Sequence, residues 1–267
     1  MAGSKSSLSA PALLELRNVT VMRGTNRVLR GLDLKIEDGE HAAILGPNGC
    51  GKSTFIKSIT RECYPLGAAD SHVRIMGRDR WNVFELRGLL GIVSNDLLNT
   101  STRDLTGREV VLSGFFSSIG LWPNHEVTAQ MRQKADELLE HLEVPHLAER
   151  YLTEMSSGEH RRIMIGRALV HAPRALLLDE PSTSLDLFAQ HELRALLRKL
   201  AQSGTGILLV THHLSDIIPE IERVILMKQG AIFGDGAKQA MLTEERLGAL
   251  FGLPVTLEQR DGYYHLW

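Results

Sequence analysis

A stretch of nine residues has the types and spacing needed to bind phosphate. Residues 46–54 read GPNGCGKST and match G-x-x-x-x-G-K-[ST], the pattern of a phosphate-binding loop, or P-loop. An apolar run of buried-strand type at 41–45 precedes the loop, and residues 53–59 continue as a helix. Because phosphate binding needs a loop between a strand and a helix, this setting disfavours a chance glycine-rich turn and predicts a nucleotide site.

Most positions of the loop have a physical role. Gly46, Gly49 and Gly51 let the backbone bend, so that several N–H groups can point at one anion. Lys52 is expected to reach the β- and γ-phosphates, and Ser53 to offer its hydroxyl to Mg²⁺. The predicted nucleotide-contacting residues of the loop are Gly46, Pro47, Asn48, Gly49, Cys50, Gly51, Lys52, Ser53 and Thr54.

A second group of chemically useful residues follows the apolar run at 175–178. A P-loop NTPase needs one carboxylate to hold the Mg²⁺ shell and a second group to orient the attacking water, and we assign these roles to Asp179 and Glu180. His212 follows the next apolar strand, where its imidazole could contact the γ-phosphate. A lone histidine would more simply be structural. In this constellation we expect Glu180, His212 and Lys52 to be catalytic.

The elements that must position these residues alternate along the chain. Two unbroken apolar strands, at 175–179 and 206–211, flank a helical pattern, which predicts a parallel sheet buried on both faces. From about residue 96, a stretch rich in glycine and aromatics leads into a helix and indicates a helical insertion. Strands are expected at 13–21, 28–36, 41–45, 73–76, 89–93, 175–179, 206–211, 223–227 and 231–233, helices at 53–59, 126–142, 158–171, 187–201 and 243–251, and a hairpin at 255–267.

Composition excludes several other classes of protein. The chain has 267 residues, 43% of them hydrophobic, with a formal net charge of −2 and a pI near 6.6, which argues against a nucleic-acid-coating surface. Residues 1–10 lack the apolar core of a secretory signal, and no later run is long enough to span a membrane. Cys50 and Cys63 are too few for a disulfide framework or a zinc site. We therefore expect a cytoplasmic chain without a nucleic-acid partner.

From about residue 13 to 236 the chain resembles ATP-binding-cassette (ABC) ATPase subunits, because five motifs fall in the family's order. Residues 155–159, MSSGE, resemble the signature motif that distinguishes this family from other P-loop NTPases. The resemblance implies that this motif binds a nucleotide held by a second subunit, so that a homodimer forms two complete sites. The residues implied to contact the partner's nucleotide are Ser156, Ser157, Gly158 and Glu159, with Asp186 from the loop 183–186 that crosses the interface.

Several residues depart from the family pattern. Asn95 stands where the family usually has Gln; its amide could still ligate Mg²⁺ or its water, so the implied metal set is Ser53, Asn95 and Asp179. Arg23 stands where an aromatic commonly stacks on adenine, and it either stacks through its planar guanidinium or is a solvated turn residue. Cys50 is either a small filler or a reactive thiol beside phosphate.

The resemblance also implies a fold and an organisation. The fold class is α/β: a P-loop NTPase core with a mostly parallel sheet, an N-terminal antiparallel β subdomain and a helical insertion at about 96–165. A disordered segment at 1–12 would precede the ATPase domain at 13–236, and a helix and hairpin at 237–267 would follow it.

The implied function is an ATPase that uses ATP and Mg²⁺ as the nucleotide-binding subunit of an ABC transporter. ATP would close a head-to-tail dimer and hydrolysis would reopen it, moving separate transmembrane permease subunits at the cytoplasmic face of a membrane. The alternative is a soluble cassette ATPase of the iron–sulfur-assembly type, which acts in assembly or remodelling without transport. A non-hydrolysing switch is disfavoured because Lys52, Asp179, Glu180 and His212 are all present.

The aromatic stretch 115–122 has two interpretations. Phe115, Phe116, Leu121 and Trp122 are most simply core of the helical insertion, but an exposed subset could form a docking groove for a partner.

Overall fold

A computed structural model describes residues 11–67, 70–94 and 104–267. The expected disorder at 1–12 falls almost wholly outside these ranges. The strands are β1 Leu14–Arg23, β2 Asn26–Ile36, β3 Ala42–Leu45, β4 His72–Ile75, β5 Leu90–Val93, β6 Ala175–Asp179, β7 Gly206–Thr211, β8 Arg223–Lys228, β9 Ala231–Ala237, β10 Leu257–Arg260 and β11 Tyr263–Leu266. The helices are α1 Lys52–Ile59, α2 Val83–Leu89, α4 Gly107–Ser113, α5 Ala129–His141, α6 Ser157–Leu169, α7 Leu187–Gln202, α8 Lys238–Met241 and α9 Glu244–Phe251.

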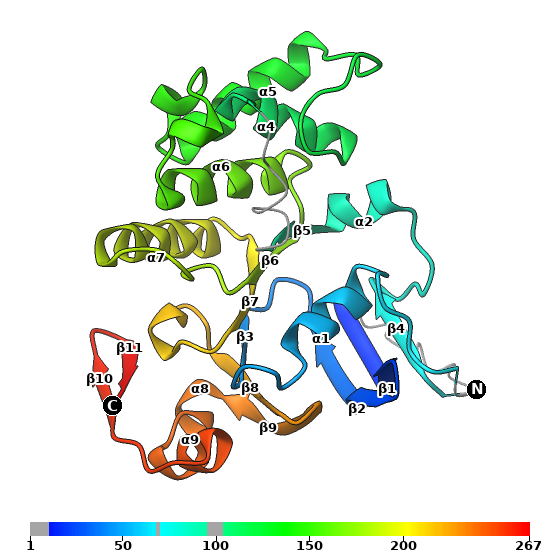
Figure 1. The fold of residues 1–267 in the computed structure, drawn as a ribbon, viewed down its shortest axis with the longest axis vertical. Coiled ribbons are helices and arrows are strands. Elements are labelled where there is room, and N and C mark those ends of the chain that lie inside the picture. The colour runs from blue at the N-terminus through cyan, green and yellow to red at the C-terminus, as the bar shows by residue number, and fades with distance from the viewer. Residues whose placement is uncertain (1–10, 68–69, 95–103) are drawn as a thin grey trace, which may run out of the picture.

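A six-stranded sheet forms the centre of the molecule, in the order β5-β6-β7-β3-β8-β9. Its first five strands run parallel, and β9 pairs antiparallel with β8 at the edge. Beside it stands a three-stranded antiparallel sheet, β2-β1-β4. Helices α4, α5 and α6 gather at the opposite end of the molecule from β1 and β2 (Figure 1). The predicted α/β fold class, with its parallel sheet, antiparallel N-terminal strands and helices, is confirmed.

Two hydrophobic clusters cover the two faces of the central sheet. Along β3, Ala43 and Leu45 belong to the cluster that also contains α4 to α7, while Ala42 and Ile44 belong to the cluster under β1 and β2. Side chains of a strand alternate between faces, so a strand buried on both faces must be apolar throughout. The unbroken apolar runs in the sequence have this cause, and the predicted burial on both faces is confirmed.

The predicted helix at 126–142 starts slightly later, because Thr128 caps α5 by accepting a hydrogen bond from the Met131 N–H. The structure adds α2, α4 and α8, which the sequence prediction missed. In α4, Thr106 and Glu109 form a reciprocal capping box. This T-x-x-E pattern is a sequence signal for a helix start, so α4 could have been found.

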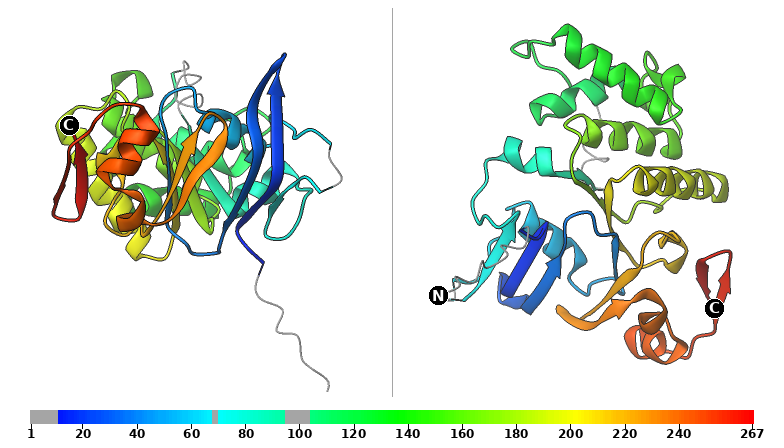
Figure 2. Two further views of the ribbon diagram at one scale, coloured as in Figure 1. Left: turned by 90° about the horizontal axis from the view of Figure 1, so that it is seen from below. Right: turned by 180° about the vertical axis from the view of Figure 1, so that it is seen from behind.

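The C-terminal hairpin β10–β11 forms around Asp261 and Gly262, as predicted. Seen from below, it lies on the far side of the molecule from β1 and β2 (Figure 2). Tyr264 is buried in the α-helical cluster, and β11 contacts the short 3-10 helix η4, Leu214–Asp216. Within the described residues no helix has the length and apolar character to cross a membrane.

Candidate active site

The P-loop joins β3 to α1 and takes backbone conformations that favour glycine. Gly49 and Gly51 have φ angles of 77° and 111°, in the left-handed region. A Cβ on Gly46 would lie 2.3 Å from the Met227 carbonyl oxygen, so only glycine fits there. Gly51 precedes α1 and offers no side-chain cap, which leaves the first N–H groups of that helix for an anion.

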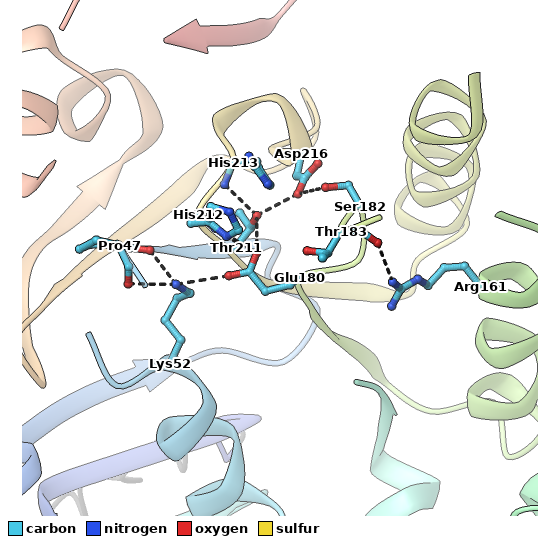
Figure 3. A network of polar contacts seen from close by, with 11 residues as sticks. Pro47, Lys52, Arg161, Glu180, Ser182, Thr183, Thr211, His212, His213 and Asp216 are labelled. Carbon is cyan, nitrogen blue, oxygen red and sulfur yellow. Dashed lines mark hydrogen bonds and ion pairs between the residues drawn. The ribbon is translucent and has the colours of Figure 1, made fainter. Parts of the chain in front are cut away.

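Lys52 is buried and held over the loop. Its Nζ donates to the carbonyl oxygens of Gly46 at 2.7 Å and Pro47 at 3.2 Å, and lies 3.3 Å from Glu180 Oε1 (Figure 3). These three partners match the three protons of an ammonium. The P-loop lysine and the predicted water-orienting carboxylate therefore meet at one point.

Cys50 fills space within the loop. The side chain is 4% exposed, and burial raises the pKa of its thiol. Its Sγ would lie 2.7 Å from a Cβ on Gly46, so it occupies the room that this glycine leaves. A buried thiol with a raised pKa is a poor nucleophile, which favours the filler alternative over the reactive one.

Asp179 and Glu180 lie where β6 ends, and the chain turns sharply between them and α7. Glu180 has a φ of 47°, and its N–H donates to the Val210 carbonyl of β7 at 2.8 Å. Asp179, Glu180 and Ser53 line one cleft of about 750 Å³. Their hydroxyl and carboxylate oxygens are the donors that Mg²⁺ prefers, and Mg²⁺ usually takes only one or two protein ligands plus phosphate. The residues present fit that ion.

Glu180 and His212 form a close pair. The Oε2 atom of Glu180 lies 2.6 Å from His212 Nδ1 and 3.3 Å from the His212 backbone N–H (Figure 3). The carboxylate fixes the ring by accepting from Nδ1–H, so that Nε2 is the nitrogen left for another ligand. The three predicted catalytic residues, Glu180, His212 and Lys52, are thus brought together by three different elements.

A buried polar cluster behind this pair was not anticipated. The carboxylate of Asp216 accepts hydrogen bonds from the hydroxyls of Ser182 at 2.7 Å and Thr211 at 2.8 Å (Figure 3). Arg161 of α6 donates to the Thr183 carbonyl at 3.4 Å, and burial lowers its pKa to about 10. Ser182 and Asp216 are 34 positions apart, so no local pattern reveals their contact.

The predicted signature segment forms the N-terminus of α6. Ser156 accepts a hydrogen bond from the Glu159 N–H, and the Glu159 carboxylate accepts one from the Ser156 N–H at 2.7 Å. This hydrogen bond, with Arg150 at 3.3 Å, lowers the pKa of Glu159, which is therefore charged at neutral pH. A Cβ on Gly158 would lie 2.9 Å from the Ala189 Cβ, so this glycine lets α6 pack closely on α7.

Residues 156–159 line a second, smaller cleft of about 250 Å³. Asp186 lines it too, and caps α7 by accepting from the Ala189 N–H at 2.8 Å. This cleft shares no lining residue with the one that contains Ser53 and Glu180. The structure thus separates the predicted site residues into two groups.

Two predicted residues are not joined to either group. Arg23 is exposed at the end of β1, where it pairs with Asn26 of β2 across the turn. Asn95 lies outside the described residues. Adenine stacking by Arg23 and metal contact by Asn95 stay predictions.

A family model and related proteins of known sequence point to the same family. Residues 29–183 match the family model described as ABC transporter. The chain is 33% identical to the uncharacterized ABC transporter ATP-binding protein YlmA of Bacillus subtilis (strain 168), covering 91% of this chain and 92% of that one. It is 31% identical to the hemin import ATP-binding protein HmuV of Aliivibrio fischeri (strain ATCC 700601 / ES114), covering 92% of each.

Two solved structures share the fold. One is cbiO1 from Clostridium perfringens, part of the ABC transporter complex cbiONQ, with a TM-score of 0.74, 25% identity and coverage of 89% of this chain and 93% of that one. The other is a dimeric post-hydrolysis state of the ATP-binding cassette MJ0796 bound to ADP and Pi, with a TM-score of 0.68, 27% identity and coverage of 84% and 98%. The chain belongs to the ABC transporter family and is an ATP-hydrolysing, nucleotide-binding transporter subunit.

Proposed function

We propose that this subunit works as a homodimer in which each ATP is held between the P-loop of one chain and the signature segment of the other. The observation that carries the proposal is the separation of two phosphate-directed helix N-termini, those of α1 and α6, into two different clefts. One nucleotide in the first cleft leaves the second helix N-terminus of the same chain unused. A head-to-tail pair uses both. The solved MJ0796 cassette is dimeric with ADP and Pi bound, which supports a dimer for this chain.

Within each composite site we assign a role to each residue, and the geometry supports these assignments. Lys52 binds the β- and γ-phosphates, and Ser53 and Asp179 would hold Mg²⁺, which would neutralise phosphate charge. Glu180 orients the attacking water and accepts its proton, and His212 contacts the γ-phosphate through Nε2. The partner's Ser156 hydroxyl keeps its own proton after accepting from Glu159 N–H, and donates it to the γ-phosphate.

The dimer proposal is tested by sedimentation with and without Mg-ATP. We expect a monomer without nucleotide and a dimer with Mg-ATP, because in the proposed dimer the phosphates of each ATP contact both chains. The ATPase rate per chain should rise with protein concentration until dimerisation saturates. A rate per chain that is constant down to concentrations at which only monomer is present would contradict the proposal.

We infer further that the subunit lies at the cytoplasmic face of a membrane and drives separate permease subunits. The relatives that are hemin import proteins support a metal-chelate substrate of the haem type.

In the aromatic stretch 115–122, some side chains belong to the core and one is exposed enough to contact a partner. Phe115 and Leu121 pack against the core, and Phe116 stacks on His125 with ring centroids 4.2 Å apart. Trp122 is 45% exposed and is the one we assign to the permease contact.

Trp122→Ala should therefore fold, hydrolyse ATP and lose affinity for the permease by about 1–3 kcal/mol, because a buried interface aromatic contributes on that order. The measurement is co-purification of the tagged chain with its permease from detergent-solubilised membranes. Phe116→Ala is the matched control, since its ring is already used within the chain. Full permease binding by folded Trp122→Ala would place the contact elsewhere. Recovery of soluble scaffold proteins alone would favour an assembly ATPase.

A further inference from the structure

Asp216 is a buried carboxylate directly behind the proposed catalytic pair. It is 3% exposed, and one of its oxygens, Oδ2, accepts hydrogen bonds from both Ser182 and Thr211. Ser182 belongs to the loop that follows Glu180, and Thr211 immediately precedes His212. Asp216 thus joins the two segments that carry the pair.

The Thr211 hydroxyl has a single proton and more than one neighbour that could accept it. Asp216 Oδ2 lies 2.8 Å from its oxygen, and Glu180 Oε2 lies 3.5 Å away. The His213 N–H donates to the same hydroxyl oxygen at 3.0 Å, so the oxygen already uses a lone pair. Because the distance to Asp216 is shorter, the Thr211 hydroxyl donates its hydrogen bond to Asp216.

The direction of the Thr211 hydrogen bond also determines which donors contact Glu180. With the Thr211 hydroxyl donating to Asp216, Oε2 of Glu180 accepts hydrogen bonds from the ring and backbone nitrogens of His212. A further hydroxyl donor at Oε2 would compete with the His212 nitrogens for this oxygen and would move the carboxylate from the position that these contacts give it. Burial raises the pKa of Asp216, while its two hydroxyl donors, His213 and Arg194 oppose that rise.

We propose that Asp216 is a positioning residue for ATP hydrolysis: its carboxylate accepts the hydrogen bond of the Thr211 hydroxyl and so keeps that hydroxyl from donating to Glu180. The inference rests on the proposed role of Glu180 as the base. Asp216 touches neither nucleotide nor water in this scheme, and it acts through Thr211 alone.

The test is a set of variants measured for kcat, KM and ATP binding. Asp216→Ala frees the Thr211 hydroxyl to turn toward Glu180, and we expect kcat to fall about tenfold with KM changed less than about twofold. Adding Thr211→Val to that variant removes the misdirected hydroxyl and should restore most of kcat. A purely structural role for Asp216 does not predict that rescue. Ser182→Ala is the matched control, because it removes the other donor to the same oxygen and should leave kcat within about twofold.

Asp216→Asn keeps the shape, and its amide oxygen can accept from both hydroxyls, so it should retain kcat even if Asp216→Ala does not fold. Loss of kcat in folded Asp216→Asn, or a double variant no faster than Asp216→Ala, would overturn the proposal. Glu180→Gln distinguishes a wrong role for Glu180 from a wrong role for Asp216. If Glu180→Gln remains active, the role of Glu180 is wrong. If it is inactive while Asp216→Ala turns over normally, only the role of Asp216 is wrong.

Discussion

Glu180→Gln should lower the rate of ATP hydrolysis by about 10²–10⁴-fold, the range over which general bases contribute. The amide keeps the shape of the side chain and can still contact Lys52 and His212, but it cannot accept a proton from water. Mg-ATP should therefore bind with little change, and the protein should accumulate as a dimer that does not reopen.

The measurement combines steady-state ATPase rates, nucleotide affinity and sedimentation with Mg-ATP. Glu62→Gln is the matched control, because Glu62 lines the same cleft and its substitution removes the same charge. We expect that control to behave as wild type. An ATPase rate for Glu180→Gln close to that of the wild type would contradict the role of Glu180 as the base.

Ser156→Arg should abolish ATP-dependent dimerisation and reduce turnover to the level of an isolated chain. The substitution places a long side chain in the small cleft that also contains Asp186, and it removes the hydroxyl proposed to contact the partner's γ-phosphate. Binding of ATP to the monomer should persist, because none of the P-loop residues 46–54 lines that small cleft.

Loss of a helix cap alone costs about 1 kcal/mol, so the variant needs a control for stability. Thr128→Arg provides it, since Thr128 caps α5 in the same way without lining either cleft. Thermal unfolding should shift similarly in both variants, and dimerisation should fail only in Ser156→Arg. A Ser156→Arg chain that still dimerises with ATP in light scattering would remove the signature segment from the interface.

Most of the fold and of the site could be predicted because the information is local. The P-loop, the buried strand before Asp179 and the signature segment are each contiguous, and their spacing fixes their chemistry. The antiparallel pairing of β1 with β2 and the hairpin around Asp261 and Gly262 also follow from short-range patterns.

What could not be predicted depends on contacts between distant segments. Whether Cys50 is reactive is decided by its burial beneath Gly46, and the closeness of Gly158 to Ala189 by the packing of α6 on α7. The contact of Asp216 with Ser182 joins η4 to the loop after β6, two segments that only the sheet brings side by side. None of these contacts corresponds to a periodic or local pattern in the sequence.

The carboxylate of Glu159 has a consequence for how the dimer responds to ionic strength. Its negative charge lies at the end of α6 that would receive the partner's γ-phosphate, so two like charges approach each other when the dimer closes. Salt shortens the range of this repulsion, from a Debye length of about 10 Å at 0.1 M to about 3 Å at 1 M. The wild-type dimer should consequently tolerate added salt better than a Glu159→Gln dimer, in which there is no such repulsion to screen.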